Sequence, residues 1–146
     1  LKQFEPYLGK TYRGELSEES GKSVDIGKYE RILNGTAVRH THSLNEGEYG
    51  GETIIYYNAE NKRIEFYYFT TAGFFTNGYM IFEENKIVSF EKVTGNSNNI
   101  TEVKALSEIM SDGSISVESM YLKEGKWIKG HSAIYRESPG AEIIFK

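Results

Sequence analysis

Three histidines have the widest chemical range of any side chains in this sequence, and two of them, His40 and His42, are separated by one residue. Alternate residues of a β-strand point to the same face, so both imidazoles should lie on one side. An imidazole can exchange a proton, form hydrogen bonds or bind a metal near neutral pH. The pair therefore predicts the polar lining of a ligand cavity, a metal site, or two structural hydrogen bonds.

A tight turn at Asn34-Gly35 fixes how the strand carrying the histidines pairs with the strand before it. Both residues tolerate the positive φ of a type I′ turn, and such a turn sets the register of its hairpin. One face then carries a Glu30–Arg39 ion pair, which a solvated surface tolerates. We expect the other face to point inward, and it holds Gly27, Tyr29, Arg31, His40 and His42.

The next hairpin is expected to bring a carboxylate to the same interior. The face that we assign inward here carries Glu52, Ile54, Tyr56, Ile64, Phe66 and Tyr68. Glu52 is the exception in this apolar set, and an acid in such a wall needs a cationic or hydrogen-bonding partner. Arg31 or a histidine could serve.

The last hairpin, closed by Glu124-Gly125, pairs Glu118 with the third histidine, His131. We assign this face inward, although apolar residues compete on the opposite face. The inward face carries Glu118, Met120, Leu122, Trp127, Lys129 and His131, and the competing residues are Ile115, Tyr121, Ile128 and Ile134. Glu118 and His131 could act as a base and the group that orients it, or form a structural hydrogen bond.

A metal site is the alternative use of the histidines. His40, His42 and Glu46 reproduce the His-x-His-(three residues)-Glu spacing found in cupins, and His131 is the remaining candidate for a fourth ligand. The main interpretation includes no metal and no cofactor.

Composition excludes several classes of protein. The 146 residues contain no cysteine, which removes a disulfide scaffold, a thiolate nucleophile and any cysteine-ligated metal. The formal charge of −4 has both signs interspersed, so a nucleic-acid partner is not expected. No segment reaches the roughly 18 consecutive apolar residues of a membrane span. Phosphate-binding glycine loops, Gly-x-Ser-x-Gly and His-Glu-x-x-His are absent from the sequence.

Short β-rich runs separated by turn residues continue from end to end of the chain, which predicts one all-β domain over residues 1–146. A meander of about ten antiparallel strands is expected to close into a barrel, because closure removes exposed sheet edges. A short turn over residues 4–8 should lead into it. The expected strands are 10–16, 25–33, 36–45, 51–57, 63–70, 73–82, 87–95, 99–110, 114–122 and 127–137, with the inward faces of 73–82 and 99–110 left open.

The whole chain resembles the calycin β-barrels, which include lipocalins and fatty-acid-binding proteins, and in particular their secreted bacterial relatives. The residues that carry the resemblance are Leu8-Gly9-Lys10-Thr11-Tyr12-Arg13-Gly14, Tyr29-Glu30-Arg31-Ile32-Leu33-Asn34-Gly35, Glu48-Tyr49-Gly50-Gly51-Glu52-Thr53 and Tyr135-Arg136. The resemblance implies a barrel around a ligand cavity, with Tyr12 and Arg136 in place of the lipocalin tryptophan and its arginine partner.

We therefore expect a small-molecule-binding barrel, monomeric or homodimeric, that holds a partly apolar ligand. The alternative is an enzyme in the same cavity, either metal-dependent or a His/Glu acid–base isomerase or hydrolase. A first residue of Leu favours a processed, periplasmic or secreted protein, with a cytoplasmic location left open. The expected ligand-binding residues are Tyr29, Arg31, His40, His42, Glu52, Tyr68, Glu118 and His131.

Overall fold

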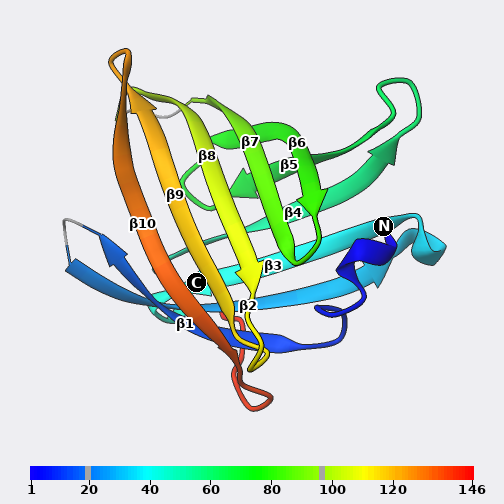
Figure 1. Ribbon diagram of the computed structural model, residues 1–146. Coiled ribbons are helices and arrows are strands. Elements are labelled where there is room, and N and C mark those ends of the chain that lie inside the picture. Colours follow the sequence, from blue (N-terminus) through cyan, green and yellow to red (C-terminus); the bar gives the residue numbers. More distant parts are fainter. Residues whose placement is uncertain (19–20, 96–97) are drawn as a thin grey trace.

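Ten antiparallel strands close into a single barrel in which each strand pairs with its neighbours in sequence and β1 pairs with β10 (Figure 1). The computed structural model describes residues 1–18, 21–95 and 98–146. The closed meander predicted from the sequence is confirmed. Its strands are β1 (Thr11–Glu18), β2 (Gly21–Ile32), β3 (Ala37–Leu44), β4 (Tyr49–Asn58), β5 (Arg63–Thr70), β6 (Phe75–Glu83), β7 (Lys86–Thr94), β8 (Ile100–Ile109), β9 (Ile115–Lys123) and β10 (Lys126–Glu137).

The β2–β3 hairpin has the predicted register, with Tyr29 opposite His40 and Gly27 opposite His42. The loop begins one residue earlier than a two-residue turn requires, because Leu33 has a φ of 50°, ahead of Asn34 at 55° and Gly35 at 89°. Asparagine and glycine tolerate this left-handed conformation, so the turn chemistry of the sequence still determines the pairing.

The core follows a row of inward-facing side chains across three neighbouring strands. Val38, Ile55 and Phe66 lie opposite one another on β3, β4 and β5 and are at most 2% exposed. This row identifies the inner face of each strand, because successive residues alternate between the two faces. Even-numbered residues of β3 and β5 therefore point inward, as do odd-numbered residues of β4.

One end of the barrel is closed by the N-terminal segment, which begins with a 3₁₀ turn over Lys2–Phe4 (η1). Phe4 and Tyr7 are buried, and Phe4 packs edge-on against Phe82 with ring centroids 5.4 Å apart. The segment is anchored by a hydrogen bond of 3.0 Å from the Gly9 amide to the Tyr29 carbonyl. This confirms the short lead-in turn and gives it a role as a plug.

The interior face of β4 differs from the prediction by one residue. Glu52 lies opposite Thr41 and Phe69 on the outer face, whereas Thr53 and Ile55 point inward. Both faces of β4 carry large apolar residues, so the apolar pattern did not discriminate between them. The predicted inward faces of Ile54 and Tyr56 are wrong for the same reason, while the inward positions of Ile64, Phe66 and Tyr68 are confirmed.

A β-bulge changes the register of the last hairpin. The predicted pairs Leu122–Trp127 and Met120–Lys129 are present, but the register shifts between Lys129 and Ser132, so that Glu118 lies opposite Ser132. The predicted inward face of this hairpin is also wrong: Ile115 and Ser119 are buried inside, whereas Glu118, Met120 and Trp127 are exposed.

The strands whose faces were left open are now assigned. On β6, Thr76, Gly78, Met80 and Phe82 share the inner face, and Val103, Ala105, Ser107 and Ile109 share it on β8. Several inward-facing residues on the β6–β8 side remain half-buried rather than buried, which leaves them partly accessible to solvent. No helix in the described part of the chain is long and apolar enough to cross a membrane.

Candidate functional site

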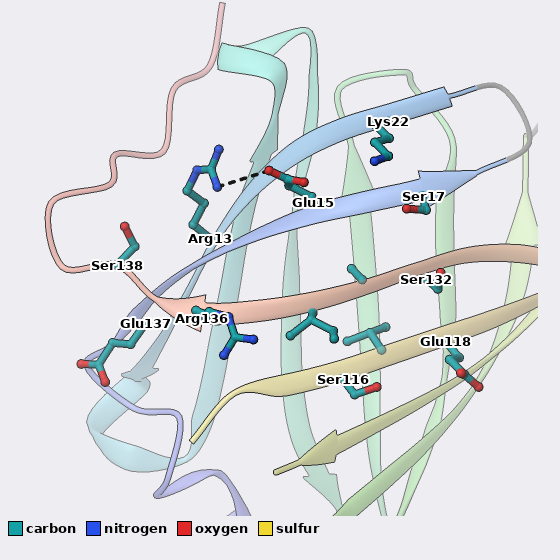
Figure 2. A pocket seen from close by; sticks show the side chains of 13 residues that line it. Arg13, Glu15, Ser17, Lys22, Ser116, Glu118, Ser132, Arg136, Glu137 and Ser138 are labelled. Atoms are coloured by element: carbon teal, nitrogen blue, oxygen red, sulfur yellow. Dashed lines mark ion pairs between the residues drawn. The ribbon is translucent and has the colours of Figure 1, made fainter. Parts of the chain in front are cut away.

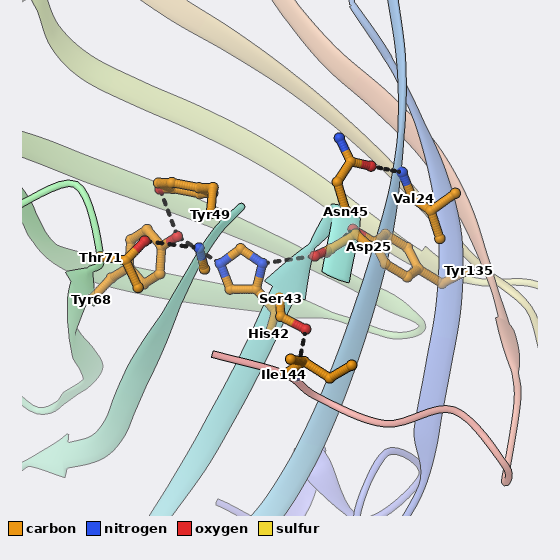
Figure 3. Close-up of polar contacts among 11 residues, drawn as sticks. Val24, Asp25, His42, Ser43, Asn45, Tyr49, Tyr68, Thr71, Tyr135 and Ile144 are labelled. Carbon is orange, nitrogen blue, oxygen red and sulfur yellow. Dashed lines mark hydrogen bonds and ion pairs between the residues drawn. The ribbon is translucent and has the colours of Figure 1, made fainter. Parts of the chain in front are cut away.

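Five polar side chains form a continuous hydrogen-bonded network inside the barrel, which we call the polar network (Figure 3). Its centre is the buried Asp25 carboxylate, which lies 2.8 Å from Nδ1 of His42 and 2.7 Å from the Tyr135 hydroxyl. On the other side of the imidazole, Nε2 lies 2.6 Å from the Tyr68 hydroxyl. The Tyr68 hydroxyl lies in turn 2.8 Å from that of Tyr49.

The Asp25 carboxylate sets the direction of these hydrogen bonds. A carboxylate only accepts, so His42 Nδ1 carries a hydrogen, and in the Nδ1–H tautomer Nε2 accepts from the Tyr68 hydroxyl. The Tyr68 oxygen then accepts from the Tyr49 hydroxyl. The open end of the polar network is therefore the Tyr49 oxygen, which has a lone pair available for a donor in the interior.

The network is neutral at its tyrosine end. Burial raises the pKa of Tyr49 to about 12, and burial raises the pKa of Tyr68 well above its ordinary value. The charge of the nearby Glu91 carboxylate raises both values further. Both hydroxyls therefore keep their protons at neutral pH and act through hydrogen bonds.

His40 is a second inward imidazole, and it stacks on Tyr29 with ring centroids 4.3 Å apart and lies parallel to His42 at 5.9 Å. Burial, with a smaller contribution from His42, lowers the pKa of His40 from 6.5 to about 3, so the ring is neutral. Gly27 makes room for it, because a Cβ atom there would lie 2.9 Å from His40 Nε2.

His131 reaches the interior through the bulge in β10. Its Nδ1 lies 2.8 Å from the Tyr121 hydroxyl and 3.0 Å from the Ser119 hydroxyl. Gly130, beside it, is buried and would place a Cβ 2.5 Å from the Ser119 oxygen. The third histidine therefore contacts inward-facing residues of β9 rather than the predicted Glu118.

Glu91 is an interior carboxylate that the sequence analysis did not identify. It lies opposite Gly78 and Val103 on the inner face of β7 and is half-buried. Of the side chains that the structure describes, none forms a hydrogen bond or ion pair with it. Burial raises the pKa of Glu91 from 4.5 to about 7, because no nearby positive charge favours the ionised form.

Glu91 should make stability depend on pH in an identifiable window. Its folded pKa lies above its ordinary value, so the stability that it contributes is complete below pH 4.5 and is lost as the pH rises to about 7. We expect Glu91→Gln to be more stable than the parent by on the order of 1–3 kcal/mol at neutral pH and equal to it at acidic pH.

Urea unfolding from acidic to neutral pH measures this difference. The pKa of His40 is shifted in the opposite direction, and its effect on stability cancels when the free energy of unfolding of the parent is subtracted from that of the variant. Glu102→Gln is the control, because it removes an exposed carboxylate from the neighbouring strand. Its stability relative to the parent should not change with pH in this window. A constant difference for Glu91→Gln across the window would contradict the interior placement of its carboxylate.

Three of the predicted ligand-binding residues lie away from the interior. Arg31 shares the inward register but is exposed at the strand end, where it pairs with Glu5. Glu52 lies on the outer face near Arg39. Glu118 lines a hollow on the outer surface of β1, β2, β9 and β10, together with Arg13, Lys22 and Ser132 (Figure 2).

The remaining five predicted residues, Tyr29, His40, His42, Tyr68 and His131, have inward-facing side chains. The structure adds Asp25, Tyr49, Glu91 and Tyr135. Asp25 could have been found by extending the β2–β3 register two residues beyond the Gly27–His42 pair. Tyr49 precedes the predicted start of its strand, and Glu91 lies on a strand whose face the sequence did not determine.

In residues 1–18, 21–95 and 98–146, no group of three or more His, Asp or Glu side chains is placed to hold a metal ion. His42 uses both ring nitrogens in the polar network, and Glu46 is exposed in the turn after β3. No protein-family model matches this chain, and no curated protein matches it significantly.

Proposed function

We propose that this barrel binds a small, partly apolar molecule in its interior, with the polar network fixing the orientation of the ligand. The observation that carries the proposal is the open end of that network. Tyr49 and Tyr68 present hydroxyls inside an aromatic wall whose side chains are half-buried. Binding sites for small molecules have this composition, in which a few convergent polar groups lie in apolar surroundings.

The resemblance to calycin barrels belongs to the same proposal, since those proteins hold their ligands inside the barrel. Acid–base catalysis would use the same residues, because Asp25 orients an imidazole against a tyrosine hydroxyl. We favour binding over catalysis because both nitrogens of His42 are engaged and the interior tyrosines keep their protons. The network offers hydrogen bonds rather than a free base.

Titration with N-phenylnaphthylamine, a neutral dye whose emission rises in apolar surroundings, tests the proposal. We expect saturable binding of one dye per protein. Ala105→Phe, which adds a ring to a half-buried inward position of β8, should weaken binding by about tenfold or more. Leu106→Phe adds a similar side chain to the outer face of the same strand and should leave the affinity unchanged.

The same pair of variants can overturn the proposal. If Ala105→Phe unfolds at a much lower temperature than Leu106→Phe, the interior is already filled by protein and has no room for a ligand. If both variants bind the dye as tightly as the parent, the dye occupies the outer surface.

A further inference from the structure

Two groups in the barrel interior present open hydrogen-bond acceptors, beside the buried Thr76 hydroxyl, which has no partner among the described residues and can either donate or accept. The Tyr49 hydroxyl donates to Tyr68, which leaves its oxygen free to accept. Glu91 presents a carboxylate that has no hydrogen-bond partner in the described part of the protein. A ligand that satisfies both groups must bring donors, and an ionised donor forms stronger hydrogen bonds with a carboxylate than a neutral one.

The charged side chains of the interior also favour a cationic ligand over an anionic one. Two carboxylates, Asp25 and Glu91, lie on inward faces away from the strand ends. Of the lysines and arginines that the structure describes, none is buried or half-buried at an inward-facing strand position. Arg31, Lys123 and Lys126 share that register, but all three are exposed. An anionic ligand would therefore enter without a counter-charge, at a large desolvation cost.

Aromatic rings complete the surroundings. Tyr29, Tyr49 and Tyr68 face the interior beside the neutral His40. The face of an aromatic ring attracts cations, and this attraction grows when water is excluded. The net charge of −4 on the whole chain favours a cation at long range as well.

We propose that the ligand is a protonated amine with an apolar or aromatic body, whose ammonium group lies between the Glu91 carboxylate and the Tyr49 oxygen. This inference rests on the proposed function, since it names the ligand class of the same interior. The ammonium supplies the donors that both acceptors lack, and the apolar body contacts the tyrosine rings. Binding also supplies the positive charge that keeps Glu91 ionised.

Three probes of nearly equal size separate charge from shape: phenethylamine, which is cationic, phenethyl alcohol, which is neutral, and hydrocinnamate, which is anionic. Their affinities are measured at about pH 7.5 by calorimetry, with amide NMR shifts of inward-facing residues to locate each probe. We expect phenethylamine to bind about tenfold or more tighter than phenethyl alcohol, and hydrocinnamate to bind most weakly.

Glu91→Gln should weaken the binding of phenethylamine by about tenfold while changing the affinity for phenethyl alcohol by less than about twofold. Glu102→Gln removes an exposed outer carboxylate from the adjacent strand and should change neither affinity. Glu91→Gln is expected to fold at least as stably as the parent at this pH, so a loss of amine binding would not reflect unfolding.

The inference is overturned if phenethyl alcohol or hydrocinnamate binds as tightly as the amine, or if Glu91→Gln retains full affinity for the amine. In these outcomes the probes still shift inward-facing amides, and the proposed function stands without its ligand class. If none of the probes shifts an inward-facing amide and N-phenylnaphthylamine also fails to bind, the proposed function itself is wrong.

Discussion

Replacing Asp25 with alanine should lower the free energy of unfolding by about 3–5 kcal/mol, because two buried donors lose their acceptor in one step. The carboxylate is 4% exposed and accepts from both His42 and Tyr135. Without it, the Nδ1–H of His42 and the Tyr135 hydroxyl remain inside the barrel unpaired. Urea unfolding at neutral pH measures the loss.

Two matched variants separate the contributions to the loss of stability expected for Asp25→Ala. Tyr135→Phe removes one donor and leaves the Asp25–His42 pair intact, so it should cost about 1 kcal/mol. Glu15→Ala removes an exposed carboxylate, paired with Arg13 at the surface, and should cost less than about 1 kcal/mol. A loss below about 1 kcal/mol for Asp25→Ala would show that the carboxylate does not organise the polar network.

Asp25→Asn tests the direction of the hydrogen bonds in the polar network rather than the stability of the protein. The Tyr135 hydroxyl still needs the amide oxygen as its acceptor, so the amide NH2 should face His42 Nδ1 and donate to it. The ring should then change from the Nδ1–H to the Nε2–H tautomer, which ¹⁵N NMR of the ring nitrogens distinguishes. Tyr68 would then accept from His42 and donate to Tyr49, so the open end of the network would become a donor. An unchanged tautomer would mean that the amide oxygen accepts from His42 Nδ1–H and that Tyr135 does not hold this oxygen.

The β2–β3 hairpin was predictable because its loop contains residues that tolerate a left-handed backbone. Asn34 and Gly35 both adopt positive φ, and the pairing that they determine places Tyr29, His40 and His42 inside. Asp25 follows from the same register. The local turn chemistry therefore determines the placement of two of the five residues of the polar network, His42 and Asp25.

The β4–β5 hairpin shows why the same reasoning failed elsewhere. Its loop over residues 59–62 contains no dipeptide that specifies a turn type, and both faces of β4 are apolar. A shift of one residue exchanges the two faces of a strand, so Glu52 and Thr53 were interchanged. In a barrel the outer face also carries aromatic rings, here Tyr67 and Phe69 with centroids 6.4 Å apart, so hydrophobicity does not identify the interior.

In β10, the bulge rather than the turn decides where His131 points. The turn at Glu124-Gly125 correctly predicted the first pairs but not which of their faces points inward, and the pairing itself departs from the prediction where the register shifts after Lys129. Gly130 lies within this shift and has the close approach to Ser119 that only a residue without a side chain permits. A glycine inside a strand signals a bulge, and that signal was present in the sequence.

Phe4→Ala should cost about 3–5 kcal/mol of the free energy of unfolding, because it removes the side chain that closes one end of the barrel. Phe4 is 1% exposed and contacts rings from three parts of the chain, which are Tyr7, Tyr29 and Phe82. Chemical denaturation of the full-length chain measures the loss. Phe4→Leu retains most of the buried volume and should cost less than half as much.

Phe69→Ala is the matched control, since this ring lies on the outer face and is 53% exposed. Its loss should be near 1 kcal/mol or less, because little apolar area returns to water. Equal losses at the two positions would mean that the N-terminal segment packs no more tightly than the outer surface. A loss confined to Phe4→Ala would instead make the first turn of the chain part of the core, with its ring held against β2 and β6.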